Sequence, residues 1–143
     1  MTIAAIIERK GGSVVTLRSD APVRDAVALL AEHRIGAVIV VGQEDAVAGI
    51  LSERDVVRCL ASEGPGVLDL PVSSVMTAPA ITIEPRVSVL AALSDMSKRR
   101  IRHLPVVEGG RLAGIVSIGD LVAYRIRKIE EEAEAMRVYI QSA

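Results

Sequence analysis

Two copies of one short motif carry the side chains best placed to do chemistry. The motif reads glycine, two apolar residues, serine, two variable residues and aspartate, and it occupies residues 49–55 and 114–120. In each copy an apolar stretch typical of a strand ends at the serine, and a helix is predicted to begin there. A hydroxyl, a carboxylate and free helix amides would therefore meet at the end of a strand, where they suit an anion and a ribose diol.

The same spacing also suits simple helix capping, with serine at the N-cap and the acid at the third helical position. A reciprocal capping box prefers glutamate or glutamine at that position, because the shorter aspartate reaches the N-cap amide less easily. Capping and ligand binding are compatible, and the motif residues leave both open.

The motif belongs to a longer repeat. Residues 16–41 align with residues 82–107 at an offset of 66, and the two motif copies follow at an offset of 65. Two copies are too few for a solenoid, which needs about three units. We therefore expect two half-domains related by a pseudo-twofold axis.

Each copy predicts the order strand, helix, strand, strand, helix, so the expected fold class is α/β (α+β). The first helix of each copy follows Pro22 or Pro85 and ends near Arg34 or Arg100. The second helix begins after the motif serine. The predicted strands cover residues 14–17, 37–41 and 46–51, and then residues 80–83, 104–107 and 111–116.

Flanking segments complete the chain. A short helix over residues 2–10 is predicted to be capped by Thr2 and stopped by the glycines that follow it. The resulting division gives a first repeat with its N-terminal helix at residues 1–62, a linker at 63–71, a second repeat at 72–125 and a C-terminal amphipathic helix at 126–143.

The C-terminal helix has a heptad-like apolar seam. Ile126, Ile129, Ala133, Met136 and Ile140 follow spacings of 3, 4, 3 and 4, with glutamates on the other faces. The seam either packs back on the chain's own core or makes a subunit contact, and the sequence favours neither.

Composition excludes several classes of protein. Of 143 residues, 50% are hydrophobic and 24% charged, which excludes disorder. A net charge of -1 and only two aromatic residues argue against a nucleic-acid partner. The longest apolar run, residues 35–41, is far shorter than the roughly 20 residues of a membrane span. The single cysteine, Cys59, suits a reducing compartment, and we expect a soluble cytoplasmic protein without a membrane partner.

Catalytic motifs are missing from the sequence. Residues 114–119 have the wrong spacing for a nucleophile elbow, and neither a phosphate loop nor a zinc-type His-Glu-x-x-His pattern occurs. Two histidines and one cysteine are too few for the usual metal clusters. We therefore expect no enzyme, no catalytic residue, no metal and no catalytic cofactor.

The sequence resembles tandem cystathionine-β-synthase (CBS) domains, the Bateman module, and in particular the small stand-alone bacterial CBS-pair proteins. The resemblance rests on the paired Gly-h-x-Ser-x-x-Asp motifs (h, hydrophobic) in register with the repeat, on residues 75–77 and on residues 100–106. It covers roughly residues 3–125. It implies an adenosine ligand (AMP, ADP, ATP, NAD or S-adenosylmethionine) in two clefts between the halves, and a homodimer.

Carried over residue by residue, the resemblance gives the two motif aspartates the ribose hydroxyls and the two motif serines a phosphate or sugar contact. Arg54, Arg102 and His103 are candidates for the phosphate. Because no aromatic residue precedes Tyr124, adenine is expected between aliphatic walls and backbone groups, without ring stacking. The full set of nucleotide-binding candidates is Thr16, Ala37, Val38, Ile39, Ser52, Arg54, Asp55, Thr82, Arg102, His103, Leu104, Pro105, Ser117, Ile118 and Asp120.

Two functions of different classes lead, and an enzyme of undetected type, such as a nucleotide hydrolase, is a weaker third. The first is a regulatory energy- or redox-sensing module that changes conformation or partner affinity when an adenosine nucleotide binds. Its protein partner is unknown. The second is an interaction or assembly module whose nucleotide sites are degenerate. The intact serine and aspartate of both motifs favour the first.

Overall fold

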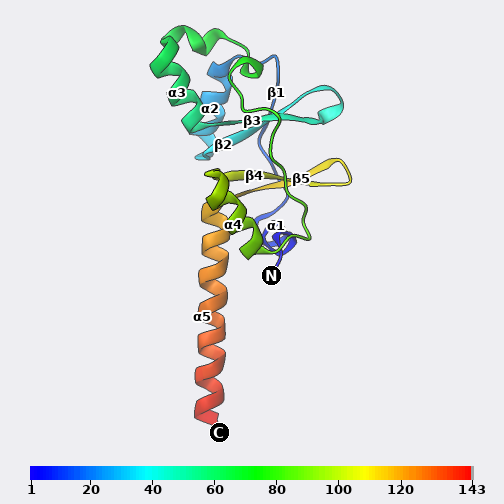
Figure 1. Cartoon of the computed structure of the whole chain (residues 1–143), viewed down its shortest axis with the longest axis vertical. Helices are drawn as coiled ribbons and strands as arrows, with labels where there is room; N and C mark the ends of the chain where they lie inside the picture. The colour runs from blue at the N-terminus through cyan, green and yellow to red at the C-terminus, as the bar shows by residue number, and fades with distance from the viewer. Residues whose placement is uncertain (143) are drawn as a thin grey trace.

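The computed structural model describes residues 1–142, and it consists of two α+β halves stacked on one another (Figure 1). The predicted fold class is confirmed. The first half contains β1 (Thr16–Arg18), α2 (Val23–His33), β2 (Ala37–Val41), β3 (Val47–Ser52) and α3 (Glu53–Glu63). The second contains α4 (Val89–Arg99), β4 (His103–Glu108), β5 (Arg111–Ser117) and α5 (Ile118–Ser142), and α1 (Ile3–Lys10) precedes both.

Each half is built on a small sheet. In the first half the strand order is β1-β2-β3, with β1 parallel and β3 antiparallel to β2. In the second half β4 and β5 pair antiparallel. The strand predicted at residues 80–83 is reduced there to a single parallel bridge between Ile83 and Val106. The repeat is therefore preserved in topology, although one of its strands has shrunk to one residue.

The helix that precedes each motif hairpin ends in the same way in both halves. Arg34 after α2 and Arg100 after α4 adopt left-handed backbone conformations, with φ of 53° and 56°. The next residue in each case, Ile35 or Ile101, donates its backbone N–H back to the last turn of the helix. The residues that follow the two turns, Gly36 and Ile101 to His103, line one cavity together with Arg100. Helix periodicity alone does not indicate this position for Arg100.

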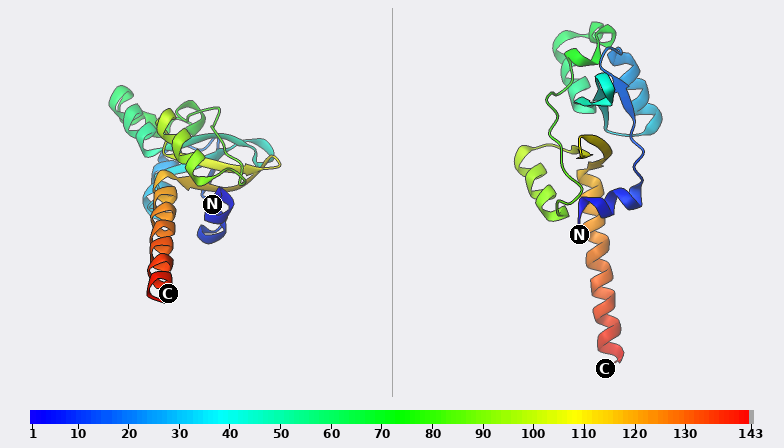
Figure 2. Two further views of the ribbon diagram at one scale, coloured as in Figure 1. Left: turned by 60° about the horizontal axis from the view of Figure 1, so that its bottom comes forward. Right: turned by 90° about the vertical axis from the view of Figure 1, so that its right-hand side faces the viewer.

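The N-terminal helix packs on the second half, although it precedes the first (Figure 2). Ile3 and Ile6 are buried in the same core as Met96 and Leu121. Thr2 occupies the N-cap position, but its side chain makes no capping hydrogen bond. The first helical amides instead donate to backbone carbonyls of residues 85 and 87, at 2.8 and 2.9 Å. The second half thus replaces the predicted threonine cap.

Each half has its own aliphatic core. The first is built around Leu30, Val38 and Leu51, and the segment after α3 adds Val72 to it. The second contains Tyr124, the single aromatic side chain that either core buries among residues 1–142. Each fully buried leucine, isoleucine or valine side chain contributes about 1.5–3 kcal/mol of hydrophobic stabilisation. Branched aliphatic residues therefore supply nearly all the core volume, as the composition suggests.

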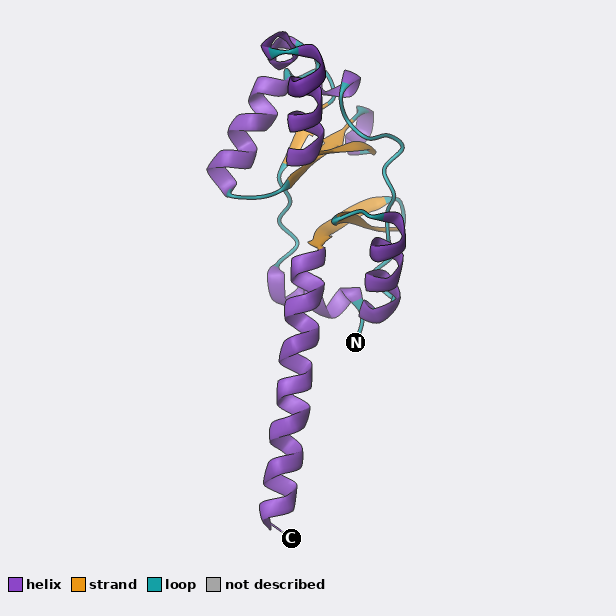
Figure 3. Cartoon of the chain, turned by 60° about the vertical axis from the view of Figure 1, so that its left-hand side comes forward, coloured by secondary structure: helices purple, strands orange, loops and turns teal. Residues whose placement is uncertain are grey.

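The last helix, α5, begins inside the second core and then leaves the body (Figure 3). Its 25 residues form one continuous helix of about 37 Å at 1.5 Å per residue. No break separates the second repeat from the tail at residue 126. Beyond Arg125 the apolar seam is exposed, so in a single chain it does not pack on the chain's own core. Within residues 1–142, no helix is long and apolar enough to cross a membrane.

Candidate functional site

The first motif forms the junction between β3 and α3. Ser52 Oγ accepts a hydrogen bond from the Asp55 backbone N–H at 3.2 Å, and Asp55 Oδ2 accepts one from the Ser52 N–H at 3.0 Å. The reciprocal capping box is therefore closed, although aspartate is shorter than the glutamate or glutamine that such a box prefers. The Thr77 hydroxyl lies 3.4 and 3.5 Å from the two carboxylate oxygens of Asp55. The Ser52 hydroxyl also lies 3.1 Å from Asp55 Oδ2, so the donors around this acid are an amide and two hydroxyl groups, without a cation.

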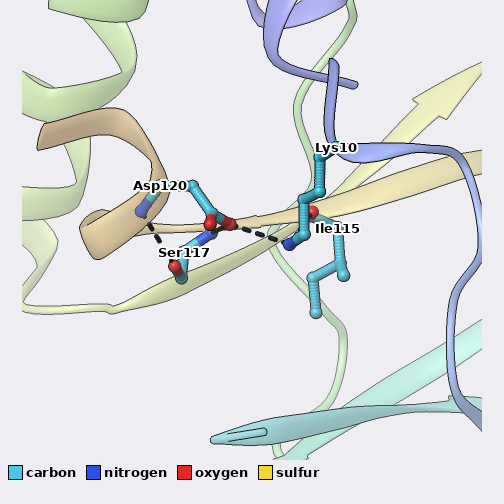
Figure 4. Close-up of polar contacts among 4 residues, drawn as sticks. All are labelled: Lys10, Ile115, Ser117 and Asp120. Atoms are coloured by element: carbon cyan, nitrogen blue, oxygen red, sulfur yellow. Dashed lines mark hydrogen bonds and ion pairs between the residues drawn. The ribbon is translucent and has the colours of Figure 1, made fainter. Parts of the chain in front are cut away.

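The second motif forms the same box between β5 and α5. Ser117 donates its backbone N–H to Asp120 Oδ2 at 2.8 Å, and Ser117 Oγ accepts from the Asp120 N–H at 3.1 Å. A further donor is present here: Lys10 Nζ lies 2.8 Å from Asp120 Oδ2 and 2.9 Å from the Ile115 carbonyl oxygen (Figure 4). Lys10 is the last residue of α1, so the packing of α1 on the second half places an ammonium on the motif acid.

The Lys10 ammonium lowers the pKa of its partner. Burial alone would raise the pKa of Asp120, but the hydrogen bonds from Lys10 and from the Ser117 amide outweigh it and lower that pKa. The carboxylate at the second motif is therefore held ionised and already paired with a cation.

A cavity of 610 Å³ lies beside the first motif and is open to solvent. This volume is within the roughly 300–1,000 Å³ usual for small-molecule sites. Its walls come from the first motif, from α3, from Thr77 near the start of the second repeat, and from the segment that follows α4. The lining residues are Gly36, Ile50, Ser52, Glu53, Arg54, Asp55, Val57, Arg58, Thr77, Arg100, Ile101, Arg102 and His103.

The cavity carries an excess of positive charge. Four arginines, two from α3 and two from the segment after α4, face two carboxylates, those of Glu53 and Asp55. Guanidinium groups hold phosphate oxygens through paired hydrogen bonds and remain charged at all physiological pH values. The cavity is therefore suited to an anionic ligand, with one acid available for hydroxyl groups.

His103 lies between the two motifs. It lines the cavity, and a Cβ atom on Gly36 would approach its Nε2 to 2.9 Å, so the glycine makes room for the imidazole. Burial lowers the pKa of His103, and the charges of Lys10 and Arg102 lower it further. Asp120 and Glu53 act in the opposite direction. One imidazole thus experiences charges from both motif sites.

Five of the residues predicted to bind nucleotide lie together on the cavity wall: Ser52, Arg54, Asp55, Arg102 and His103. Their individual roles stay predictions. The other ten candidates lie elsewhere. Val38, Ile39 and Leu104 are fully buried in the cores. The remainder are Thr16, Ala37, Thr82, Pro105, Ser117, Ile118 and Asp120, none of which lines the cavity.

Several residues of the cavity wall are not among the nucleotide-binding candidates predicted from the sequence. Arg58 stands one helical turn after Arg54, a spacing that puts both on one face of α3 and that could have indicated it. The sequence indicates only that a helix ends near Arg100, whereas the left-handed turn at that residue accompanies its position on the cavity wall. Thr77 belongs to residues 75–77, which carry the family resemblance, but its place in the sequence does not indicate that it is a neighbour of Asp55.

A second cavity, of 330 Å³, lies between α1 and β5 and suits a phosphate poorly. Its charged lining residues are Glu8 and Glu108, and the other wall residues are small or apolar. An anion would be repelled by this lining. The arginine-rich cavity is therefore the better candidate for the predicted ligand.

The fold and the site define a duplicated α/β module, with a serine–aspartate motif at the start of the last helix of each half. The family model of the CBS domain matches residues 6–62 and 72–127, so the chain belongs to the CBS domain family. It contains two CBS domains, as the sequence resemblance implies.

Relatives and solved structures support this membership. The chain is 36% identical to the mitochondrial CBS domain-containing protein CBSX3 of Arabidopsis thaliana over 98% of this chain and 72% of that one. It spans 36% and 54% of two further curated relatives. The CBS-domain containing protein ATU1752 from Agrobacterium tumefaciens has a TM-score of 0.83 and 39% identity, over 87% of this chain and 92% of that one. The CBS domain protein PAE2072 from Pyrobaculum aerophilum, complexed with AMP, has a TM-score of 0.75 and 27% identity, over 84% and 89%.

Proposed function

We propose that this chain is a regulatory module that binds an adenosine nucleotide in the arginine-rich cavity beside the first motif. The observation that carries the proposal is the position of the Asp55 carboxylate on the wall of a cavity that four arginines also line. An acid among arginines suits a ligand that has both vicinal hydroxyls and phosphates. The AMP bound by PAE2072, a CBS domain protein of the same fold, has these groups.

The proposed binding mode assigns each part of the ligand to one part of the wall. The ribose hydroxyls donate to Asp55, as carboxylates do in dinucleotide folds. The phosphates lie near the arginines of α3 and of the segment after α4. Adenine packs on the aliphatic side chains of Ile50 and Ile101, which are also on the wall. No aromatic ring is available there for stacking.

Ligand binding would act by joining the two halves. Ser52, Asp55 and Arg58 belong to the first half, whereas Arg100, Arg102 and His103 belong to the second. A nucleotide that contacts both sets favours the relative position of the halves in which both can reach it. We infer that this shift changes the affinity for a protein partner.

The single cysteine, Cys59, suits the cytoplasm as the compartment.

Isothermal titration of the full chain with AMP, ATP and NAD tests the proposal. We expect heat from at least one of these nucleotides, with one nucleotide bound per chain, because Lys10 already occupies the second motif acid. Adenosine and inorganic triphosphate serve as controls, and each should bind more weakly than the nucleotide. Absence of binding by all three nucleotides would contradict the proposal.

A second candidate function is assembly without nucleotide, and the exposed apolar face of α5 favours it. The two functions are separated by the same titration, together with sedimentation of the chain with and without nucleotide. We propose a homodimer under either function. A chain that sediments as a monomer at micromolar concentration would contradict the homodimer.

A further inference from the structure

The apolar seam of α5 begins at Val122, one helical turn before the tail of residues 126–143. Val122 extends the seam to the spacing 4, 3, 4, 3, 4 of alternating d and a heptad positions. Its larger side chains are between 43% and 65% exposed, and no described part of the chain covers them. The seam residues are Val122, Ile126, Ile129, Ala133, Met136 and Ile140.

We propose that two copies of this chain pair through α5 as a parallel, two-stranded coiled coil. A d/a seam is self-complementary, because the same row of side chains on a second helix fills the holes between its own. The occupant of the seam is therefore a second copy. The inference adds an orientation and a contact surface to the homodimer proposed above, and it does not depend on nucleotide binding.

Charge flanking the seam selects the parallel orientation. Arg125 and Glu132 occupy g positions, and Glu130 and Arg137 occupy e positions. In a parallel pair each g residue faces the e residue five positions later on the other helix. Arg125 then faces the partner's Glu130, and Glu132 faces the partner's Arg137. Every flanking pair of charges is attractive, and twofold symmetry repeats each pair once.

The antiparallel arrangement that overlaps the whole seam has the opposite charge pattern. In that arrangement e residues face e residues and g residues face g residues, so Glu130 meets the partner's Glu130 and Glu132 meets the partner's Glu132. Two like-charge contacts then lie at the centre of the interface. Isoleucine at the a positions 126 and 140 also suits a parallel two-stranded coil.

The seam is short for an independent coiled coil. It spans fewer than three heptads, whereas stable coiled coils normally sustain three or four. A parallel pair brings both bodies to the same end of the coil, where contact between them can supplement the seam. The tails therefore determine orientation, and the bodies add stability.

Cysteine cross-linking tests the orientation directly. In a Cys59→Ser background, Ala133→Cys sets residue 133 against its own copy in a parallel pair, and mild oxidation should give a disulfide-linked dimer. Glu131→Cys, at an outward f position, is the matched control and should not cross-link. An antiparallel pair would instead cross-link when an Ile129→Cys chain is mixed with an Ala133→Cys chain.

Charge exchange gives a second test that needs no cysteine. Glu132→Arg should weaken dimerisation about fivefold at low salt, since two attractive pairs become repulsive. Adding Arg137→Glu should restore it. Glu132 and Arg137 are both exposed on α5, so these two substitutions should leave folding of the body unaffected. Monomeric wild-type chain would overturn both the homodimer and the pairing, whereas a dimer without the 133–133 cross-link would overturn the pairing alone.

Discussion

The two motif sites share a sequence pattern and a capping box but differ in what reaches the acid. At the first site the Thr77 hydroxyl approaches Asp55 at 3.4 Å. At the second the Lys10 ammonium approaches Asp120 at 2.8 Å. Lys10 lies before β1 and Thr77 before the bridge at Ile83, so each stands ahead of the first strand position of its repeat. Each makes a hydrogen bond to the isoleucine after the motif glycine, Thr77 to Ile50 and Lys10 to Ile115. The segment before the first strand of each repeat, and not the motif, thus determines which donor reaches the carboxylate.

The same segments also pack differently against the motif glycines. A Cβ atom on Gly49 would lie 2.7 Å from both the Thr77 carbonyl oxygen and Met76 Sδ. A Cβ atom on Gly114 would meet only the Ile7 side chain, with Cδ1 at 2.6 Å. A backbone carbonyl in a bridge cannot move without breaking hydrogen bonds, whereas a terminal methyl group can rotate away. At the first site, the neighbouring segment therefore contacts the motif glycine through its backbone as well as the Met76 side chain. At the second site, the contact is made by a side chain alone.

Alanine substitution of the two glycines should show the largest difference between the sites. We expect Gly49→Ala to lower the free energy of unfolding by about 3 kcal/mol, because the Ile50–Thr77 bridge must open. Gly114→Ala should cost about 1 kcal/mol, since the Ile7 side chain can adopt another rotamer. Urea denaturation of both variants measures the difference. Equal costs would show that the two segments are equally adaptable.

Alanine substitution of the two acids should separate their roles in binding. Asp55→Ala is expected to weaken nucleotide binding about 10- to 100-fold, the loss of one or two hydrogen bonds to a charged group. Asp120→Ala is expected to leave the affinity within about threefold, because Lys10 already pairs with that acid. Each variant loses its own capping box, so each is the other's control for helix stability.

Titration calorimetry with the tightest of AMP, ATP and NAD measures these affinities, and thermal unfolding checks that both variants fold. An equal loss in the two variants would show that the second motif also binds nucleotide. It would also contradict the stoichiometry of one per chain. The comparison therefore tests the asymmetry of the sites and not merely the presence of binding.

The repeat allowed much of the fold to be predicted from the sequence. The strand at 37–41 and the helix starts after Ser52 and Ser117 are confirmed, because apolar periodicity and capping residues act locally. The packing of α1 on the second half could not be predicted in this way. Ile3 and Ile6 have an ordinary helical spacing that does not indicate which core will bury them.

The candidate site shows the same limit. Ser52 and Asp55 could be identified because they stand three positions apart at a helix start. The Lys10–Asp120 ion pair joins residues 110 positions apart, and no spacing rule indicates it. Arg100 resembled an ordinary cation at a helix C-terminus. Only the left-handed turn after α4 shows that it faces the cavity.

His103 reports on both sites, and its titration gives the smallest of the expected effects. Its pKa is lowered in the folded chain, so the unfolded chain takes up the proton first as the pH falls. The contribution of neutral His103 to the free energy of unfolding is therefore fully present above about pH 6.5, the ordinary histidine pKa. It declines as the pH falls toward the pKa of His103 in the folded chain. The slope in this range should stay below the one-proton limit of about 1.4 kcal/mol per pH unit.

Charge substitutions on either side of His103 should move this pH dependence in opposite directions. Lys10→Met removes a cation that lowers the pKa of His103, so the acid-side loss of stability should shrink. Glu53→Gln removes an anion that raises this pKa, so the loss should grow.

NMR titration of the imidazole gives the pKa changes, and urea denaturation from pH 7.5 to 5.5 gives the stabilities. His103→Gln should remove the dependence. Because the lowered pKa of Asp120 affects stability only below about pH 3.8, its ion pair does not obscure this range. Movement of both variants in the same direction would show that His103 does not lie between the charges of the two sites.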